Sequence, residues 1–341
     1  MRTNLNIRTV GRRALRLLTA FAFVLTGFSC ESIYDDQSDC PRGVSIRFRY
    51  DYNMLFADAF SSQVDCITCY VFDAGGNFVA QYSDEGLPLA DEGYRMEFPL
   101  EAGRYTLIAY GGLTCERSSF DVTQFTRAFT HCTDMTVRLR TDGDLHLSAS
   151  LHGLYYGTRE VDILPDGYRE ITIDMMKDTN NIRIALQQIN NAPVDIGDFD
   201  ITLTDDNSLL DWRNMPVAAG EVTYTPWYTG TAIAGESDGK DGEPGREVRV
   251  GVAELSTSRL MASHSVRLRI HAADREFDAV DIPLIDYLIA MKSEIYSKMP
   301  AQEFLDRQSE WNLTFFLSRG VWVYVEIQVL DWTVRINNIN L

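Results

Sequence analysis

The sequence predicts an all-β protein with one short helix in its second half. Short segments in which apolar and polar residues alternate recur along the chain, and clusters of turn-forming residues separate them, a pattern typical of β-sandwiches. One segment differs, because its apolar residues recur at helical spacings of four, three and four: Leu284, Leu288, Met291 and Ile295. We therefore expect a helix over residues 283–299, begun by Pro283 and ended by Pro300.

The first half is expected to begin with a strand over residues 44–50, in which every second side chain is apolar. The next strand, 64–72, is joined to 78–82 by a short link with two glycines, which supply the positive φ values that a tight hairpin needs. Alternation predicts four further strands in this half: 94–98, 105–110, 135–140 and 171–175.

The second half is expected to start near residue 177, so that the two sandwich domains span residues 44–176 and 177–341. The stretch 229–246 is rich in Gly, Asp and Glu. It offers little to bury, so we expect a mobile loop there. The predicted strands of this half are 182–189, 199–204, 222–228, 248–255, 266–271, 313–317, 321–330 and 332–336.

The N-terminus has the pattern of a secretory signal peptide. Five arginines and no acidic residue precede the apolar run 17–28, which Ser29 and Cys30 follow. This run is too short to span a hydrocarbon core of ~30 Å. Because bacterial lipoproteins are cleaved and acylated at such a cysteine, we expect a signal peptide over residues 1–29, cleavage between Ser29 and Cys30, a lipid on Cys30, and an acidic tether over residues 30–43. The alternative is an ordinary signal with Cys30 as a structural thiol.

Composition and charge limit the classes of partner that this chain can bind. The chain of 341 residues is 45% hydrophobic, enough for a substantial core. Its net charge is −18, and loss of the five signal arginines takes it to −23. Such a surface repels nucleic acid and acidic headgroups. A lipid would therefore have to supply any membrane anchorage.

Five cysteines remain beside Cys30: Cys40, Cys66, Cys69, Cys115 and Cys132. We expect a disulfide between Cys115 and Cys132, because both lie near strand ends across a short connection in a chain destined for an oxidising compartment. Cys66 and Cys69 have the spacing of a redox or zinc pair. They lie within a predicted strand, however, where residues three apart point to opposite faces. No metal site is expected from them.

No motif predicts an enzyme or a cofactor. The string Gly235-Glu-Ser-Asp-Gly239 resembles a hydrolase nucleophile elbow, but the residues after it cannot form the required helix. The same stretch lacks the alternating acidic ligands of a calcium loop. No metal-ligand spacing links the histidines: His131, His146, His152, His264 and His271. Core or interface roles are expected for the tryptophans, with a sugar-stacking platform as the alternative: Trp212, Trp227, Trp311, Trp322 and Trp332.

Several strings together resemble the FimB/Mfa-type fimbrial anchor family of Bacteroidales. In the first half these are residues 40–54, 56–60, 71–78 and 100–107. In the second half they are residues 302–308, leading into 313–317, and the closing 331–334. The acidic residues Asp35, Asp36 and Asp39 are similar to the signals that route lipoproteins of this group to the cell exterior.

The resemblance implies two transthyretin-like β-sandwich domains held by lipid at the outer membrane, surface-exposed at the base of a fimbrium. It implies fimbrial shaft subunits as partners, and no catalytic residue. Two alternatives remain, a tip or shaft adhesin subunit of the same system and a surface glycan-binding lipoprotein. In related shaft subunits a trypsin-like protease removes the first strand and leaves a groove. Arg42, Arg47 and Arg49 are the basic residues close to that strand here.

An anchor that keeps its first strand has no groove to offer, so it should donate a strand, which would also limit or terminate polymerisation. The expected donor is the C-terminal segment 321–330 or 332–341, in the second case with Trp332, Val334 and Ile336 filling a partner's pockets. The alternative is that both strands belong to the second domain's own sheet.

Overall fold

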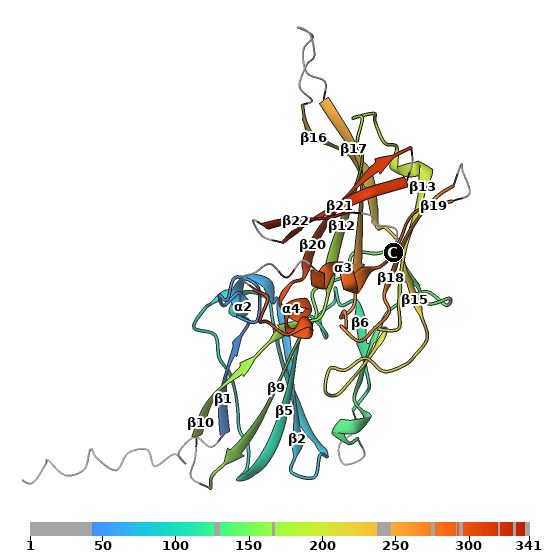
Figure 1. The fold of residues 1–341 in the computed structure, drawn as a ribbon. Coiled ribbons are helices and arrows are strands. Elements are labelled where there is room, and N and C mark those ends of the chain that lie inside the picture. Colours follow the sequence, from blue (N-terminus) through green and yellow to red (C-terminus); the bar gives the residue numbers. More distant parts are fainter. Residues whose placement is uncertain are drawn as a thin grey trace, which may run out of the picture.

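The computed structural model describes residues 43–125, 130–165, 168–236, 247–273, 277–290, 292, 296–319, 321–329 and 332–337. Among these residues, β-strands in five sheets dominate and three short α-helices join them (Figure 1). The expectation of an all-β chain built from β-sandwiches is confirmed.

The first sandwich packs a three-stranded sheet, in the order β10-β1-β4, on a five-stranded sheet, in the order β11-β9-β5-β2-β3. Strand β1 lies between β10, to which it is parallel, and β4, to which it is antiparallel. The short helix α2 (Phe60–Gln63) follows β1. The strands are β1 (Gly43–Arg49), β2 (Cys66–Asp73), β3 (Phe78–Glu85), β4 (Met96–Phe98), β5 (Gly103–Gly111), β9 (Tyr155–Ile163), β10 (Tyr168–Asp174) and β11 (Met176–Lys177).

The second sandwich packs a six-stranded sheet, in the order β16-β17-β12-β20-β21-β22, on a five-stranded sheet, in the order β19-β18-β13-β15-β8. The six strands of the first are β12 (Asn180–Gln188), β16 (Tyr228–Glu236), β17 (Glu247–Thr257), β20 (Glu310–Ser318), β21 (Val321–Val329) and β22 (Trp332–Asn337). Those of the second are β8 (His146–Leu147), β13 (Phe199–Asp205), β15 (Val222–Tyr224), β18 (Arg267–Ala272) and β19 (Phe277–Pro283).

The two halves share strands and a core. Strand β7 (Thr136–Leu139) of the first half pairs with β14 (Leu209–Asp211) of the second and with β6 (Phe120–Val122), and β8 pairs with β15. Alternate residues of β2 enter different cores: Val71 packs inside the first sandwich, whereas Phe72 joins the core that extends into the second. The domain boundary near residue 177 stays a prediction, since residues 120–147 pair across it.

The single predicted helix over residues 283–299 is wrong in its extent and number. Helix α3 (Leu284–Ala290) ends early, and a separate helix α4 (Ala301–Arg307) follows. Pro300 is the N-cap of α4 and not the end of the first helix. Leu284 and Leu288 are buried as the helical spacing indicates, but Met291 and Ile295 lie outside the described residues.

The predicted loop over residues 229–246 is partly a strand. Residues up to Glu236 belong to β16, which pairs antiparallel with β17 in a hairpin that extends away from the body (Figure 1). The alternation that predicts a strand is weak here, because Gly and Ala occupy inward positions beside β17 and a register shift separates Ile233 from Gly235. Residues 237–246 lie outside the described residues.

Candidate functional site

The first strand is held in place on both edges. Val44, Ile46 and Phe48 of β1 are buried in the first sandwich, which its neighbours β10 and β4 help to close. On its outer face Arg47 Nη2 lies 3.1 Å from Asp58, and Arg49 Nη2 lies 2.7 Å from Asp174. The first sandwich thus has its own strand where a removed β1 would leave a groove. Arg42 lies outside the described residues.

The last strand lies at the edge of its sheet. Strand β22 pairs antiparallel with β21 over six residue pairs and ends the six-stranded order. The predicted donor positions Trp332, Val334 and Ile336 stand opposite Val329, Ile327 and Val325 in this register. In the structure, therefore, both C-terminal strands belong to the chain's own sheet, and the outer backbone edge of β22 faces no other described strand.

The described side chains of β21 and β22 make different contacts. In β21, Trp322 and Val325 are buried, and the Trp322 ring packs edge-on against Phe315 at 6.0 Å between centroids. The described side-chain contacts of β22 come from Arg335, which pairs with Glu326 and lies 4.3 Å from the centroid of the Tyr324 ring. Because exposed ion pairs contribute little to stability, this pair adds little to the attachment of β22 to β21.

The disulfide prediction is wrong. Cys115 pairs with Cys66, at a Cα–Cα distance of 5.8 Å, and not with Cys132, which is a buried free thiol. The reason is tertiary: the turn after β5 folds back on the start of β2, where the Gly112 amide donates to the Cys66 carbonyl at 3.0 Å. Cys69 lies in the core, and burial raises the pKa of its thiol.

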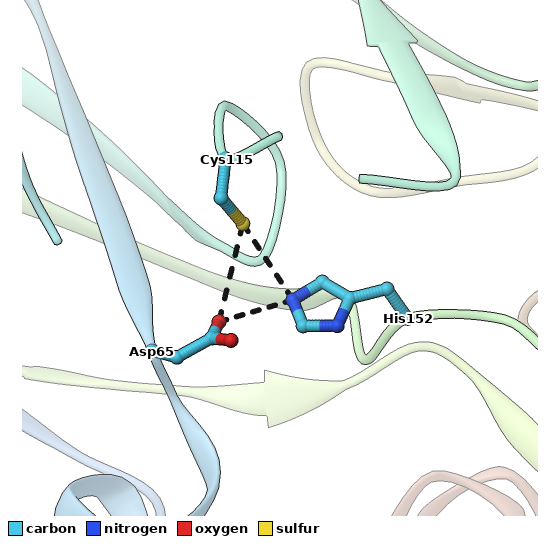
Figure 2. Close-up of side chains that lie close together, drawn as sticks. All are labelled: Asp65, Cys115 and His152. Carbon is cyan, nitrogen blue, oxygen red and sulfur yellow. Dashed lines mark hydrogen bonds and ion pairs between the residues drawn. The ribbon is translucent and has the colours of Figure 1, made fainter. Parts of the chain in front are cut away.

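A polar cluster lies beside the disulfide at the start of β2, and Figure 2 shows three of its members, Asp65, Cys115 and His152. His152 Nε2 lies 3.0 Å from Asp65 Oδ1 and 3.5 Å from Cys115 Sγ. Arg117 pairs with the other oxygen of Asp65. No sequence pattern indicates this cluster, because Asp65, Cys115 and His152 are 37 to 87 residues apart.

Each of the five histidines has a polar partner within the described residues. The partners are the Gly75 carbonyl for His131, Asp142 for His146, Asp65 for His152, Asp205 for His264 and Asp278 for His271. Four of these five partners are carboxylates. Apart from the cluster around Cys115, they are single pairs without a third ligand-type side chain among the described residues.

A buried ion pair joins helix α4 to the second sandwich near the point where the two halves meet. Arg259 donates two hydrogen bonds to Asp306, at 3.0 and 2.9 Å, and a third to the Asn214 carbonyl. The next residue of α4, Arg307, lies over the Tyr52 ring of the first half at 4.0 Å. Helix α4 therefore connects the two halves.

Asp178, between β11 and β12, is fully buried beside this ion pair. It accepts a hydrogen bond from Asn214 Nδ2 at 2.6 Å, and its Oδ2 has no protein hydrogen-bond partner among the described residues. Burial raises the pKa of Asp178 to about 7, although the positive charge of Arg259 opposes this. The carboxyl group is thus protonated more readily in the folded chain than in the unfolded one.

We expect stability to fall with rising pH because of Asp178. The pKa of Asp178 is about 4 in the unfolded chain and about 7 in the folded chain. The folded chain therefore binds the proton more tightly between these pH values. The free energy of unfolding should therefore fall by up to about 4 kcal/mol between pH 4 and 7 and then level off. Thermal unfolding of Asp178→Asn should show a higher midpoint than the parent at pH 8 and no gain at pH 5. The exposed control Asp144→Asn should show neither change, and an equal gain at both pH values would contradict the assignment.

The remaining predicted positions are placed as follows. Cys30, Ser29, Cys40 and Ser237 lie outside the described residues. Among the tryptophans with described side chains, Trp311 and Trp322 are buried, Trp212 is partly buried and Trp227 is exposed, so they form no exposed row. None of the helices within the described ranges has the length and apolar character to cross a membrane.

Solved structures of proteins described as adhesins share this fold. A Bacteroides thetaiotaomicron protein described as an adhesin is 46% identical, with a TM-score of 0.80, over 89% of this chain and 100% of that chain. Another from the same organism, described as polysaccharide-binding, is 30% identical, with a TM-score of 0.75, over 87% and 99%. The fimbrial anchor protein Mfa2 from Porphyromonas gingivalis shares the fold at 17% identity, with a TM-score of 0.65, over 86% and 99%.

Sequence comparison shows the family. The model of the fimbrillin-A associated anchor proteins Mfa1 and Mfa2 matches residues 37–338. The minor fimbrium anchoring subunit Mfa2 of Porphyromonas gingivalis is 25% identical over 237 residues, which are 66% of this chain and 69% of that protein. The chain belongs to the family of fimbrillin-A associated anchor proteins, and the resemblance found in the sequence is confirmed.

Proposed function

We propose that this protein is a non-enzymatic outer-membrane lipoprotein that anchors a fimbrium at its base and limits its polymerisation by strand pairing with the adjacent shaft subunit. One observation carries the proposal: β1 fills its own place between β10 and β4, whereas β22 lies at a sheet edge and has one neighbour, β21, among the described strands. A chain whose first sandwich keeps its own β1 and whose last described strand lies at a sheet edge is suited to donate that strand. Family membership supports the same role.

The positions of the two ends support an anchoring role. Figure 1 shows the start of β1 at the lower end of the molecule and β20–β22 in its upper half. If Cys30 carries lipid, twelve residues (31–42) separate it from Gly43, a tether of at most about 40 Å. The membrane end and the fimbrial end would then lie at different ends of the molecule.

The same geometry would also end the growth of the fimbrium. A shaft subunit that has lost its first strand accepts the strand of a neighbour, but here β1 remains covalently continuous with the lipidated N-terminus. The Arg47 and Arg49 side chains are engaged with Asp58 and Asp174. With β1 in place, no further subunit can insert a strand into the first sandwich, so growth would stop at this protein.

Lipidation is tested by Cys30→Ala. We expect this variant to lose palmitate labelling and to be released from the membrane fraction or to remain unprocessed, because no other segment would hold so acidic a chain on a bilayer. Cys40→Ala is the matched control, and it should keep both the label and the membrane location. Equal labelling of the parent and Cys30→Ala would refute lipidation at this residue.

An adhesin subunit at the tip or in the shaft is the second candidate, because the 46% identical structure is described as an adhesin. The mature N-terminus distinguishes the two roles. An anchor should begin at an acylated Cys30 in native cells, whereas a processed shaft subunit should begin after β1. Mass spectrometry of the N-terminal peptide from surface material decides between them.

A further inference from the structure

Four side chains of metal-ligating type converge where β2 begins. Asp65 precedes the strand, and Cys66 is its first residue. Cys115 comes from the turn after β5, and His152 from the segment before β9. Figure 2 shows Asp65, Cys115 and His152 pointing toward one another from three separate segments. Cys66 completes the group, because its sulfur is bonded to that of Cys115.

Three of the four ligand atoms, those of Asp65, Cys115 and His152, are spaced nearly as around a tetrahedral zinc ion, whereas Cys66 Sγ would move away from Cys115 Sγ once the disulfide is reduced. With Zn–S of ~2.3 Å and Zn–N or Zn–O of ~2.1 Å, a tetrahedron places S about 3.6 Å from N or O, and N about 3.4 Å from O. Cys115 Sγ lies 3.5 Å from His152 Nε2 and 3.9 Å from Asp65 Oδ1. His152 Nε2 lies 3.0 Å from Asp65 Oδ1. Each distance is within about half an ångström of the value for a shared zinc ion.

Charge and support around the cluster also suit a cation. Two thiolates, one carboxylate and one neutral imidazole around Zn²⁺ carry a net charge of −1, which the Arg117 guanidinium on the outer oxygen of Asp65 would balance. The Ser119 hydroxyl accepts from the His152 amide at 2.9 Å and fixes that segment. Such contacts to ligating residues tune affinity. Asp65, Arg117 and His152 line a surface hollow of about 600 Å³, which gives an ion access.

We propose that Asp65, Cys66, Cys115 and His152 form a zinc site that is closed by the disulfide and opened by its reduction. In the oxidised chain the two sulfurs are bonded to each other and cannot ligate. Two molecules of a thiol reductant convert the disulfide to two cysteine thiols and themselves become a disulfide. Zn²⁺ then displaces the two thiol protons, and the imidazole and carboxylate complete four-coordination. Zinc itself changes no oxidation state.

The test measures zinc bound to the purified full-length protein in detergent, with and without the phosphine reductant TCEP. After removal of free metal, we expect about one zinc per reduced chain and less than a tenth of that per oxidised chain. Cobalt added in place of zinc should give a thiolate-to-metal charge-transfer band. His152→Gln leaves both cysteines in place, and it should weaken zinc binding by the reduced protein at least tenfold.

His146→Gln is the matched control, because His146 also pairs with an aspartate but has no cysteine partner. It should bind zinc as the parent does. Cys132→Ser, which removes a buried free thiol outside the cluster, should behave in the same way. Failure of the reduced parent to bind zinc, equal binding by the oxidised chain, or unchanged affinity in His152→Gln would each overturn the proposal. Circular dichroism of His152→Gln shows whether a loss of zinc reflects a loss of fold.

Discussion

Ending the chain after Leu330 is expected to leave a folded protein that no longer retains fimbriae. The deletion removes β22, which has one neighbour among the described strands, and leaves β21, paired with β20, with Trp322 and Val325 buried. The second sandwich should therefore keep its circular dichroism spectrum and a cooperative thermal transition. In cells that produce the fimbrium, we expect at least a tenfold loss of cell-bound fimbriae and a matching gain in the medium. Normal retention by the trimmed, folded protein would rule out donation by the last strand.

A crosslinked variant separates detachment of β22 from simple loss of the strand. Glu326 and Arg335 stand directly opposite each other on β21 and β22. A disulfide between Glu326→Cys and Arg335→Cys would hold β22 in its own sheet. If β22 must leave to enter a partner, retention should fall in the oxidised double variant and return on reduction. The single variant Arg335→Ala, which loses only an exposed ion pair, is the control and should retain fimbriae.

Asp306→Ala is expected to destabilise the protein by about 3–5 kcal/mol, because it leaves the Arg259 guanidinium buried without its partner. Both side chains are about nine-tenths buried, with exposed fractions of 10% for Arg259 and 7% for Asp306. Since α4 connects the two halves, we expect the urea transition to broaden or split into two. Equilibrium unfolding followed by tryptophan fluorescence measures this.

Glu303→Ala is the matched control on the same helix. Glu303 pairs with Arg307 one turn away at 2.8 Å, and its side chain is 31% exposed, so we expect a loss below about 1 kcal/mol. The double variant Arg259→Met with Asp306→Leu should recover much of the lost stability, because an apolar pair avoids an unpaired buried charge. An Asp306→Ala variant no less stable than Glu303→Ala would show that the buried pair is not a structural link.

Most strands were predictable because their side chains alternate between a core and solvent. Strands β12, β18 and β20 show this pattern, and their predicted positions agree with the structure to within about three residues. Prediction failed where local sequence has no period of two. Strand β9 contains the run Gly157–Glu160, and β16 contains mainly Gly, Ala and Thr, so pairing with β5 and β17 determines them.

The helical segment failed for a related reason. Apolar spacing identified the buried face of α3 correctly, since Leu284 and Leu288 are in the core. The spacing could not show where the helix leaves the sheet. Helix α3 ends at Ala290, and a second helix, α4, begins at Ala301. Packing against the second sandwich decides helix length here, because short helices gain most of their stability from tertiary contacts.

Local composition and short strings were enough to predict the all-β class, most strands, the acidic charge and the family resemblance, because each of these depends on residues close together in the chain. Long-range packing determines which cysteine pairs with Cys115, which residues surround His152 and Asp178, and that β22 lies at the edge of the described sheet. These features depend on contacts between segments far apart in the chain, as between Asp65 and His152, 87 residues apart. Residue spacing along one strand carries no information about them, because β-pairing order and turn geometry bring such residues together.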